Sequence, residues 1–289
     1  MLYGSYAFDY HRPEINDQLL MPNIALISTR QTKEDFSAFV TSKPAGQHKL
    51  ATPYDGSYLS PLYIYASAES KHTEQIRLMN QRDTIETRRP NLSQEFISAT
   101  KKQLRLSFAE RGGEMENTFG PSDVLQYVYA ALYSQSYRSS YDRFLKTDFP
   151  RIPPTTDREL FAALGQKGGE LISLHLMESP KLANFITKYE QPGDHLVDKI
   201  LYAEANPKAG IKAGRVYTNG AQYFDGVPKE VWEFQIGGYQ VCEKWLKDRK
   251  GRKLSSDDID HYQKIVVALN ETIRLMREID EIIPGWPLP

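Results

Sequence analysis

The segment 230–283 reads EVWEFQIGGYQVCEKWLKDRKGRKLSSDDIDHYQKIVVALNETIRLMREIDEII. Its second half predicts one long helix, because apolar residues recur there at steps of three and four. The members of this apolar stripe are Ile259, Tyr262, Val266, Leu269, Ile273, Met276, Ile279 and Ile283. Ser255 or Ser256 can cap the helix, and Asp257 and Asp258 suit the positive end of its dipole. Such a stripe must be covered, and ordinary core packing is the expected cover.

A short helix and a basic turn come before the long helix. The short helix follows Gly237-Gly238 and carries the apolar residues Tyr239, Val241, Cys242, Trp245 and Leu246. The basic turn, Lys247–Lys253, contains five basic residues and one acid. It is either a solvated loop or a patch that contacts phosphates beside a helix end, and charge alone leaves both open.

Composition excludes several classes of protein. The 289 residues are 40% hydrophobic and 11% aromatic, so the chain can bury a core as one large domain or two small ones. With a net charge of −1, nucleic-acid binding would have to come from a local patch. The single cysteine, Cys242, excludes an internal disulfide and a cysteine-based metal site. The sequence has neither a signal-like N-terminus nor an 18-residue apolar window, so we expect a soluble cytoplasmic protein.

The first part of the chain, residues 1–110, is predicted to be rich in β-structure. Compact apolar runs bounded by Pro, Gly, Asn and Asp predict strands at 24–28, 36–40 and 62–65. The polar segment 67–93 predicts a linker or crossing loop. Ser93 can then cap a helix over 94–104.

The second part, residues 111–289, is predicted to be a helical scaffold with an inserted β section. Phe119-Gly120-Pro121 predicts a helix start, a short helix follows over 137–145, and the prolines of 148–154 must interrupt the helices. Gly168-Gly169 inside the next helix indicates close packing or a kink. Strands are predicted at 196–202, 214–218 and 222–224, with Asn219-Gly220 as a two-residue hairpin loop. We therefore predict an α+β fold in which the two parts form one continuous domain.

The search for catalytic motifs is negative. The sequence contains no GxxxxGK[ST] loop, no GxGxxG fingerprint and no GxSxG elbow, and its six histidines show no HExxH spacing. Cys242 lies on an apolar helical face, which favours a buried structural thiol. The carboxylates at 257, 258 and 260 are explained as helix-start residues. We therefore predict no catalytic residue, no metal and no cofactor in this chain, although an active site assembled from scattered residues stays open.

Three long blocks carry a family resemblance. They are FGPSDVLQYVYAALYSQSYRSSYDRFLKTDFPRIP (119–153), DRELFAALGQKGGELISLHLM (157–177) and VWEFQIGGYQVCEKWLKDRKGRKLSSDDIDHYQKIVVALNETIRLMREID (231–280). These blocks resemble the C-terminal target-recognition region of single-polypeptide restriction–modification proteins, the type ISP enzymes and the related type IIG-like adenine methyltransferases. STRQT (28–32) and RRPNLS (88–93) are similar to blocks further upstream in the same region. The resemblance covers most of the chain from about residue 20 onward.

The resemblance implies that the chain reads a DNA sequence and leaves the chemistry to other parts of the enzyme. The family's cofactor motif and its [ND]PP[YF] catalytic motif do not occur here. We therefore expect S-adenosylmethionine to bind in a methyltransferase domain of the same or an adjacent polypeptide. The expected partners of this chain are that domain and double-stranded DNA, with no membrane involved.

The chemistry of the side chains predicts which residues would contact DNA. Recognition needs loops that reach base edges and cations that hold phosphates. Candidates on strand-end loops and the hairpin are Arg30, Gln31, Thr32, Lys33, Tyr54, Tyr58 and Asn219; candidates for the backbone are Arg88, Arg89, Lys247, Arg249, Lys250 and Arg252. Two other functions stay open. One is a methyltransferase or nuclease with an unrecognised active site, and the other is a scaffold whose C-terminal apolar stripe binds a partner helix.

Overall fold

A computed structural model describes residues 13–46, 51, 56–65, 88–114 and 117–288 of the chain. Contacts divide the chain into two compact units. Unit 1 comprises residues 1–172 and 276–289, and unit 2 comprises residues 173–275. Two helices, α9 (Arg158–His175) and α12 (Ser256–Ile282), pass from one unit to the other. Helices and several small sheets occur in both units, so the predicted α+β class is confirmed.

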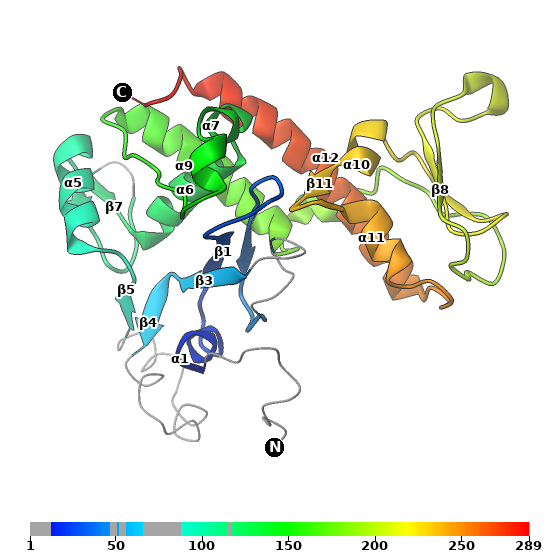
Figure 1. Ribbon diagram of the computed structural model, residues 1–289, viewed down its shortest axis with the longest axis horizontal. Coiled ribbons are helices and arrows are strands. Elements are labelled where there is room, and N and C mark those ends of the chain that lie inside the picture. Colours follow the sequence, from blue (N-terminus) through cyan, green and yellow to red (C-terminus); the bar gives the residue numbers. More distant parts are fainter. Residues whose placement is uncertain (1–12, 47–50, 52–55, 66–87, 115–116, 289) are drawn as a thin grey trace. The chain divides into compact units, whose positions relative to one another are not determined.

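Unit 1 begins with α1 (Pro13–Asn16) and η1 (Asp17–Leu19), followed by a three-stranded antiparallel sheet (Figure 1). The central strand is β1 (Ala25–Thr29), with β2 (Ala38–Thr41) on one side and β3 (Ser57–Pro61) on the other. The strands predicted at 24–28 and 36–40 are thus confirmed with small shifts at their ends. β3 corrects the prediction, because Tyr58 lies in a strand rather than in the expected loop. A small core forms beneath the sheet from Leu19, Ala25, Ile27, Ala51 and Leu59.

A second, two-stranded ribbon leads into the first long helix of unit 1. β4 (Tyr63–Tyr65) pairs antiparallel with β5 (Arg88–Pro90), so the last residues of the predicted linker form a strand instead. The linker residues 66–87 lie outside the described part of the chain. α5 (Gln94–Leu104) has the predicted bounds, and the Ser93 hydroxyl accepts the Phe96 N–H at 3.2 Å as its cap. The parallel pair β6 (Ser107–Phe108) and β7 (Thr118–Phe119) follows.

The helices of unit 1 pack by their apolar faces. α6 (Pro121–Tyr133) begins at the predicted proline. The single helix expected over 137–145 is instead two, α7 (Gln135–Ser140) and α8 (Asp142–Leu145), separated at Tyr141. The start of α7 is held by Asp280, whose carboxylate accepts the backbone N–H groups of Gln135 at 3.0 Å and Ser136 at 3.2 Å. A core cluster joins these helices to the sheet through Phe36, Ala38, Leu132, Tyr137 and Leu145.

Unit 2 contains a second three-stranded antiparallel sheet, in the order β10-β9-β8. Its strands are β8 (Leu201–Ala203), β9 (Arg215–Tyr217) and β10 (Tyr223–Asp225), with η2 (Pro180–Ala183) and η3 (Pro207–Ala209) in the connecting segments. The predicted two-residue hairpin is wrong by one residue. Thr218 N–H donates to the Gln222 carbonyl at 3.0 Å, so the loop between them has three residues, Asn219–Ala221. Side-chain hydrogen bonds of Asn219 make this longer loop the favoured one.

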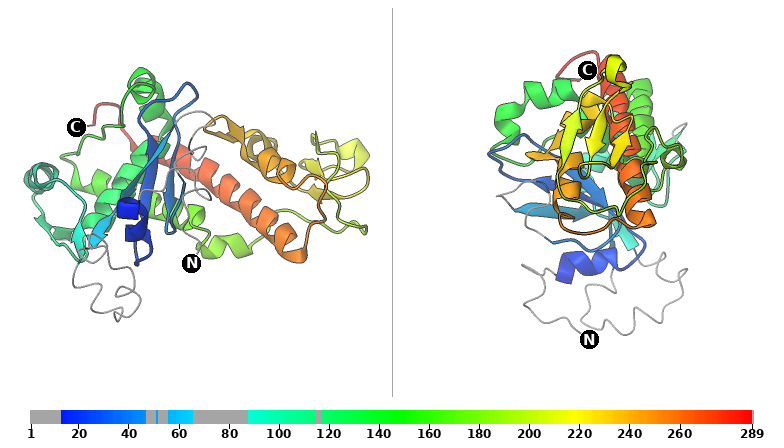
Figure 2. Two further views of the ribbon diagram at one scale, coloured as in Figure 1. Left: turned by 60° about the horizontal axis from the view of Figure 1, so that its bottom comes forward. Right: turned by 90° about the vertical axis from the view of Figure 1, so that its right-hand side faces the viewer.

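Short elements lead from this sheet to the final helix. α10 (Lys229–Glu233) precedes a small hairpin of β11 (Gln235–Ile236) and β12 (Tyr239–Gln240). Gly237 and Gly238 form the hairpin loop with φ values of 57° and 80°, a left-handed conformation that favours glycine. The predicted short helix is α11 (Val241–Lys247), and Figure 2 shows it alongside the first half of α12. Its contact with α12 includes the rings of Trp245 and Tyr262, 5.2 Å apart.

The predicted long helix, α12, is confirmed. The prediction that its apolar stripe packs in the core is confirmed as well. The cap is Ser255, because its hydroxyl accepts the Asp258 N–H at 3.1 Å while the Asp258 carboxylate accepts the Ser255 N–H at 3.1 Å. In unit 2 the stripe packs with Val197, Val216, Phe224, Val231, Cys242, Leu246 and Leu254. Every stripe residue except the half-buried Ile259 is buried. Among the described residues, no helix is long and apolar enough to cross a membrane.

Gly168 and Gly165, both in α9, provide a test of the packing in unit 1. A Cβ on Gly168 would lie 1.8 Å from the Gln126 carbonyl oxygen of α6, whereas a Cβ on Gly165 would meet nothing within 4 Å. We expect Gly168→Ala to lower the free energy of unfolding by roughly 1–3 kcal/mol, since the helices would have to separate. Gly165→Ala should raise it by about 0.5–1 kcal/mol, through helix propensity. Urea unfolding followed by circular dichroism checks both, and equal effects of the two variants would contradict the close helix contact.

Candidate nucleic-acid interface

The loop after β1 presents three of the predicted base-reading residues to solvent. Arg30, Gln31 and Lys33 are exposed, whereas Thr32 is buried. The Thr32 hydroxyl accepts the Glu34 N–H at 3.1 Å, and the Thr32 N–H donates to the Lys146 carbonyl at 3.3 Å. These bonds fix the turn of the loop. Thr32 therefore holds the loop in place, and its neighbours are the side chains available to a ligand.

A second segment of unit 1, residues 146–149, forms a wall beside this loop. The Arg30 Nε lies 3.9 Å from Asp148 Oδ1. The rings of Tyr58 and Phe149 meet edge to face, with centroids 5.0 Å apart. Tyr58 is opposite Ser28 in the register of β1 and β3, close to the point where β1 leaves the sheet. The structure thus brings two separately predicted elements, the Arg30 loop and Tyr58, onto one surface.

Asp148 gives this surface a negative charge, but its ion pair with Arg30 adds little to the stability of the fold. The Phe149 N–H, together with Arg151, holds the pKa of the Asp148 carboxyl below its usual value, so the group is ionised at neutral pH. Arg30 and Asp148 keep 59% and 45% of their side-chain surface in contact with solvent, and exposed ion pairs contribute little to stability. The contact is also too long for a tight hydrogen bond. The Arg30 guanidinium can therefore turn its paired N–H groups toward an incoming acceptor.

The remaining predicted residues of unit 1 have less uniform environments. The Arg88 guanidinium lies over the ring of Tyr63, 3.8 Å from its centroid, and its Nε is buried without a hydrogen-bond partner in the described part of the chain. Arg89 is exposed on the same strand, opposite Ile64. Tyr54 lies outside the described residues. Arg88 therefore packs as part of β5, and Arg89 presents its charge to solvent.

The basic turn of unit 2 divides into structural and exposed cations. Arg249 stacks on Trp245 at 3.5 Å, and its Nε donates to the Asp258 carboxylate at 3.2 Å. These contacts join the end of α11 to the start of α12. Lys247 pairs with Glu243 at 2.8 Å on the surface of α11. Lys250 and Arg252 are exposed, so they are the residues of the turn best placed to meet a phosphate.

Asn219 is a structural residue of its loop, and it is linked to the basic turn. Its Oδ1 accepts the N–H groups of Ala221 at 2.9 Å and Gln222 at 2.8 Å, and its Nδ2 donates to the Leu196 carbonyl at 2.9 Å. The next residue, Val197, donates its N–H to the Arg252 carbonyl at 2.9 Å. Segment 196–197 therefore lies between the two predicted elements and holds them together. The hydrogen-bonding groups of the Asn219 amide are occupied by these contacts.

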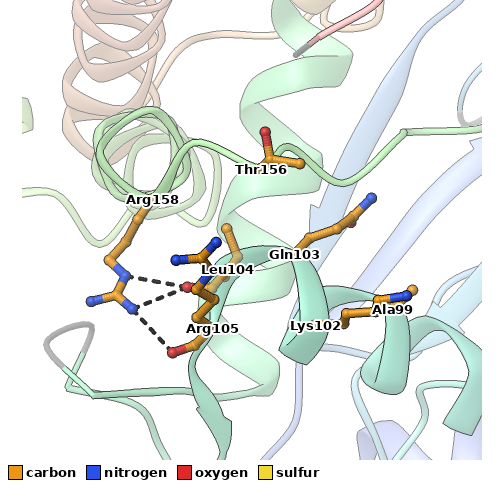
Figure 3. A pocket seen from close by; sticks show the side chains of 7 residues that line it. All are labelled: Ala99, Lys102, Gln103, Leu104, Arg105, Thr156 and Arg158. Atoms are coloured by element: carbon orange, nitrogen blue, oxygen red, sulfur yellow. Dashed lines mark hydrogen bonds between the residues drawn. The ribbon is translucent and has the colours of Figure 1, made fainter.

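Two basic depressions contain residues that the sequence did not single out. In unit 2, Lys199 lines a depression of about 630 Å³ together with Lys247, Lys250, Asp198, Glu243 and Ile200. In unit 1, Lys102, Arg105 and Arg158 line a depression of about 770 Å³ at the end of α5 (Figure 3). For the depression in unit 1, the sequence offered one signal: the segment from Lys71 to Arg111 contains nine basic residues and five acidic ones. Arg158 had no such signal, because only the fold brings α9 beside α5.

The chemistry-bearing groups elsewhere are built for structure. Cys242 is buried in the core of unit 2, where burial raises the pKa of its thiol to about 12. The predicted structural thiol is thus confirmed, because a thiolate would not form at neutral pH. In the part of the chain that the structure describes, no three His, Cys, Asp or Glu residues are grouped so as to hold a metal ion.

Comparison with known proteins places the chain in a family. Residues 1–278 match the family model described as the Type ISP C-terminal specificity domain. Because the match spans nearly the whole sequence, the chain belongs to this family. No curated protein is detectably similar to it in sequence.

Three solved structures share the fold at low sequence identity. The Type ISP restriction–modification enzyme LlaBIII bound to DNA is 17% identical, with a TM-score of 0.62 over 92% of this chain and 16% of that one. A nuclease-deletion mutant of the Type ISP enzyme LlaGI, in complex with a DNA substrate mimic, is 18% identical, with a TM-score of 0.56 over 92% and 22%. The DrdV–DNA complex is 18% identical, with a TM-score of 0.66 over 94% and 26%. The chain therefore spans about a quarter or less of the length of these enzymes.

Arg249 and Lys250 are adjacent in sequence and should behave differently when removed. Arg249→Ala should lower the free energy of unfolding by roughly 1–2 kcal/mol, because it removes a charged hydrogen bond and a cation–π interaction. Lys250→Ala should change it by less than about 0.5 kcal/mol, since the residue is exposed. Thermal and urea unfolding measure both. A loss of stability in Lys250→Ala as large as in Arg249→Ala would show that the division into structural and exposed cations is wrong.

Proposed function

We propose that this chain is the part of a restriction–modification enzyme that recognises a specific duplex DNA sequence. The observation that carries the proposal is the match of residues 1–278 to the Type ISP C-terminal specificity domain. The three solved structures compared above are DNA complexes, as their descriptions state. A specificity domain of this kind acts by binding and needs no catalytic group of its own.

The surface around the β1 loop supports base reading by this chain. Arg and Gln side chains offer paired hydrogen bonds that match guanine and adenine edges in the major groove. Arg30 and Gln31 are exposed at the end of a strand whose sheet, turn and neighbouring wall hold the backbone in place. Fixed backbone and exposed donors are the combination that direct readout requires, because a loop that must become ordered on binding lowers the affinity.

The reaction served by this recognition belongs to the rest of the enzyme. We propose that the partner is an adenine-specific methyltransferase domain, of the type ISP or type IIG-like kind, in the same or an adjacent polypeptide. S-adenosylmethionine would bind in that domain, and the assembly would act in the cytoplasm. The small share of the solved enzymes that this chain spans supports the division of labour, since most of their length lies outside the shared fold.

The apolar stripe of α12 is used inside the molecule. Tyr262, Val266 and Leu269 are buried in the core of unit 2, and Met276 and Ile279 are buried in unit 1. A stripe that is already covered cannot also receive a partner helix without unfolding its own core. The buried stripe therefore favours DNA recognition over the alternative of a scaffold that binds through this face.

Selection of binding sites from a randomised pool of duplexes tests the proposed function. The full chain should retain duplexes that share one short sequence, and competition with unrelated duplex should leave that sequence bound. Specific sites are typically bound about 10³–10⁷ times more tightly than unrelated DNA. If the chain retains duplexes without any shared sequence, it binds DNA but does not recognise a target.

Arg30 and Arg89 separate base reading from phosphate binding in unit 1. Arg30→Ala should relax the preference at one base pair of the selected site by roughly 1–3 kcal/mol, because the variant cannot form a paired hydrogen bond with a base edge. Arg89→Ala, at an exposed position predicted to hold the DNA backbone, is the matched control and should weaken binding to all sequences alike. Competition assays with single-base variants of the selected site give both values. An equal loss of affinity on all sequences for Arg30→Ala would assign that residue to the phosphate backbone instead.

A further inference from the structure

A basic depression at the C-terminal end of α5 is lined by no residue of the β1 loop and by none that the sequence predicted to bind DNA. Its lining consists of Ala99, Lys102, Gln103, Leu104, Arg105, Thr156 and Arg158. Three of these seven residues are cations and none is an acid. The walls come from the end of α5 and from the segment that enters α9, so the depression lies wholly within unit 1 (Figure 3).

Arg158 makes this end of the helix acceptable to an anion. The last carbonyl groups of a helix carry the negative end of its dipole, which repels negative ligands. Here Arg158 donates from Nη2 to the carbonyls of Leu104 and Arg105, both at 3.0 Å, and from Nε to Leu104 at 3.3 Å (Figure 3). A guanidinium thus neutralises the helix end. The neighbouring cations are therefore not needed to neutralise the helix end, and they can attract a ligand.

Lys102 and Arg105 supply that charge. Both are exposed, and neither forms an ion pair within the described part of the chain. Arg105 terminates α5 in the left-handed conformation, with φ 54°. Asp157, the acid next to Arg158, is engaged in its own helix start, where its Oδ1 accepts the Leu160 N–H at 3.0 Å. Glu159 is exposed on the first turn of α9 but does not line the depression.

Gln103 adds a neutral amide to the lining of the depression. Its Oε1 is buried and has no hydrogen bond within the described part of the chain. Because solvent does not reach this oxygen, a ligand in the depression would not reach it either. The N–H groups of the amide are donors of the kind that a phosphate oxygen requires.

From these contacts we propose that the depression is a phosphate-binding site that holds a backbone phosphate of the duplex, with Lys102 and Arg105 as the cations and Gln103 as a neutral donor. The proposal rests on the proposed function and adds an anchor for the DNA backbone. Such an anchor positions the duplex against the protein but carries no sequence information.

The dependence of duplex affinity on salt tests the site. In the full chain, Lys102→Gln with Arg105→Gln should lower the slope of log affinity against log salt by about one unit for each phosphate that the variant no longer neutralises. The base preference found by site selection should stay unchanged. Lys101→Gln, on the same helix but outside the depression, is the matched control and should change the slope less. Unfolding midpoints equal to that of the unmodified chain would show that the variants fold.

A second measurement separates failure of the site from failure of the proposed function. Titration with inorganic phosphate, followed by NMR of the Gln103 side-chain amide and the Arg105 guanidinium, should shift both signals in the unmodified chain, and the Gln103 signal should stay unshifted in the double variant. Normal duplex binding with an unchanged slope in the double variant would overturn the phosphate site and leave the function intact. Phosphate-induced shifts in a chain that binds no duplex would overturn the DNA role of the site together with the proposed function.

Discussion

The apolar face of α12 has to be buried, and both units bury part of it in their cores. α12 has eight stripe positions between its first turn and the residue after its end, and water would be in contact with all of them in an isolated helix. In unit 2 the cover comes from β9, β10, α10 and α11, with Val216, Phe224, Val231 and Cys242 all fully buried. In unit 1 Met276 and Ile279 are buried as well. Each unit therefore builds its core on a part of the same helix.

At each surface proposed for binding, a few polar side chains hold the backbone in place, and those side chains are not available to a ligand. Thr32 fixes the β1 loop through its hydroxyl, and Arg249 joins the basic turn to α12 through Asp258. Their neighbours in sequence keep their side chains in solvent, so these surfaces need little ordering when a ligand arrives. Arg158 acts in the same way at the end of α5 and leaves Lys102 to act outward. The type of a side chain sets which ligands it can bind. Its contacts in the folded chain decide whether it is available to bind them.

Elements with strong local signals could be predicted from the residues alone. Apolar spacing set α12 and its buried face, Ser93 set the start of α5, Pro121 set the start of α6, and Gly168 marked a close approach of helices. Such signals are read from neighbours a few residues apart, which is the range over which capping and periodicity act. The family resemblance likewise came from long contiguous blocks.

Which side chains meet across the fold could not be predicted from local patterns. No local signal predicts β3, because this strand is defined by its pairing with β1. The hairpin loop at Asn219 gains a residue because that side chain bonds the chain on either side. The wall of residues 146–149 beside the β1 loop and the placement of Arg158 at α5 join segments far apart in sequence. Contacts of this kind are set by the packing of whole elements, so no local pattern carries them.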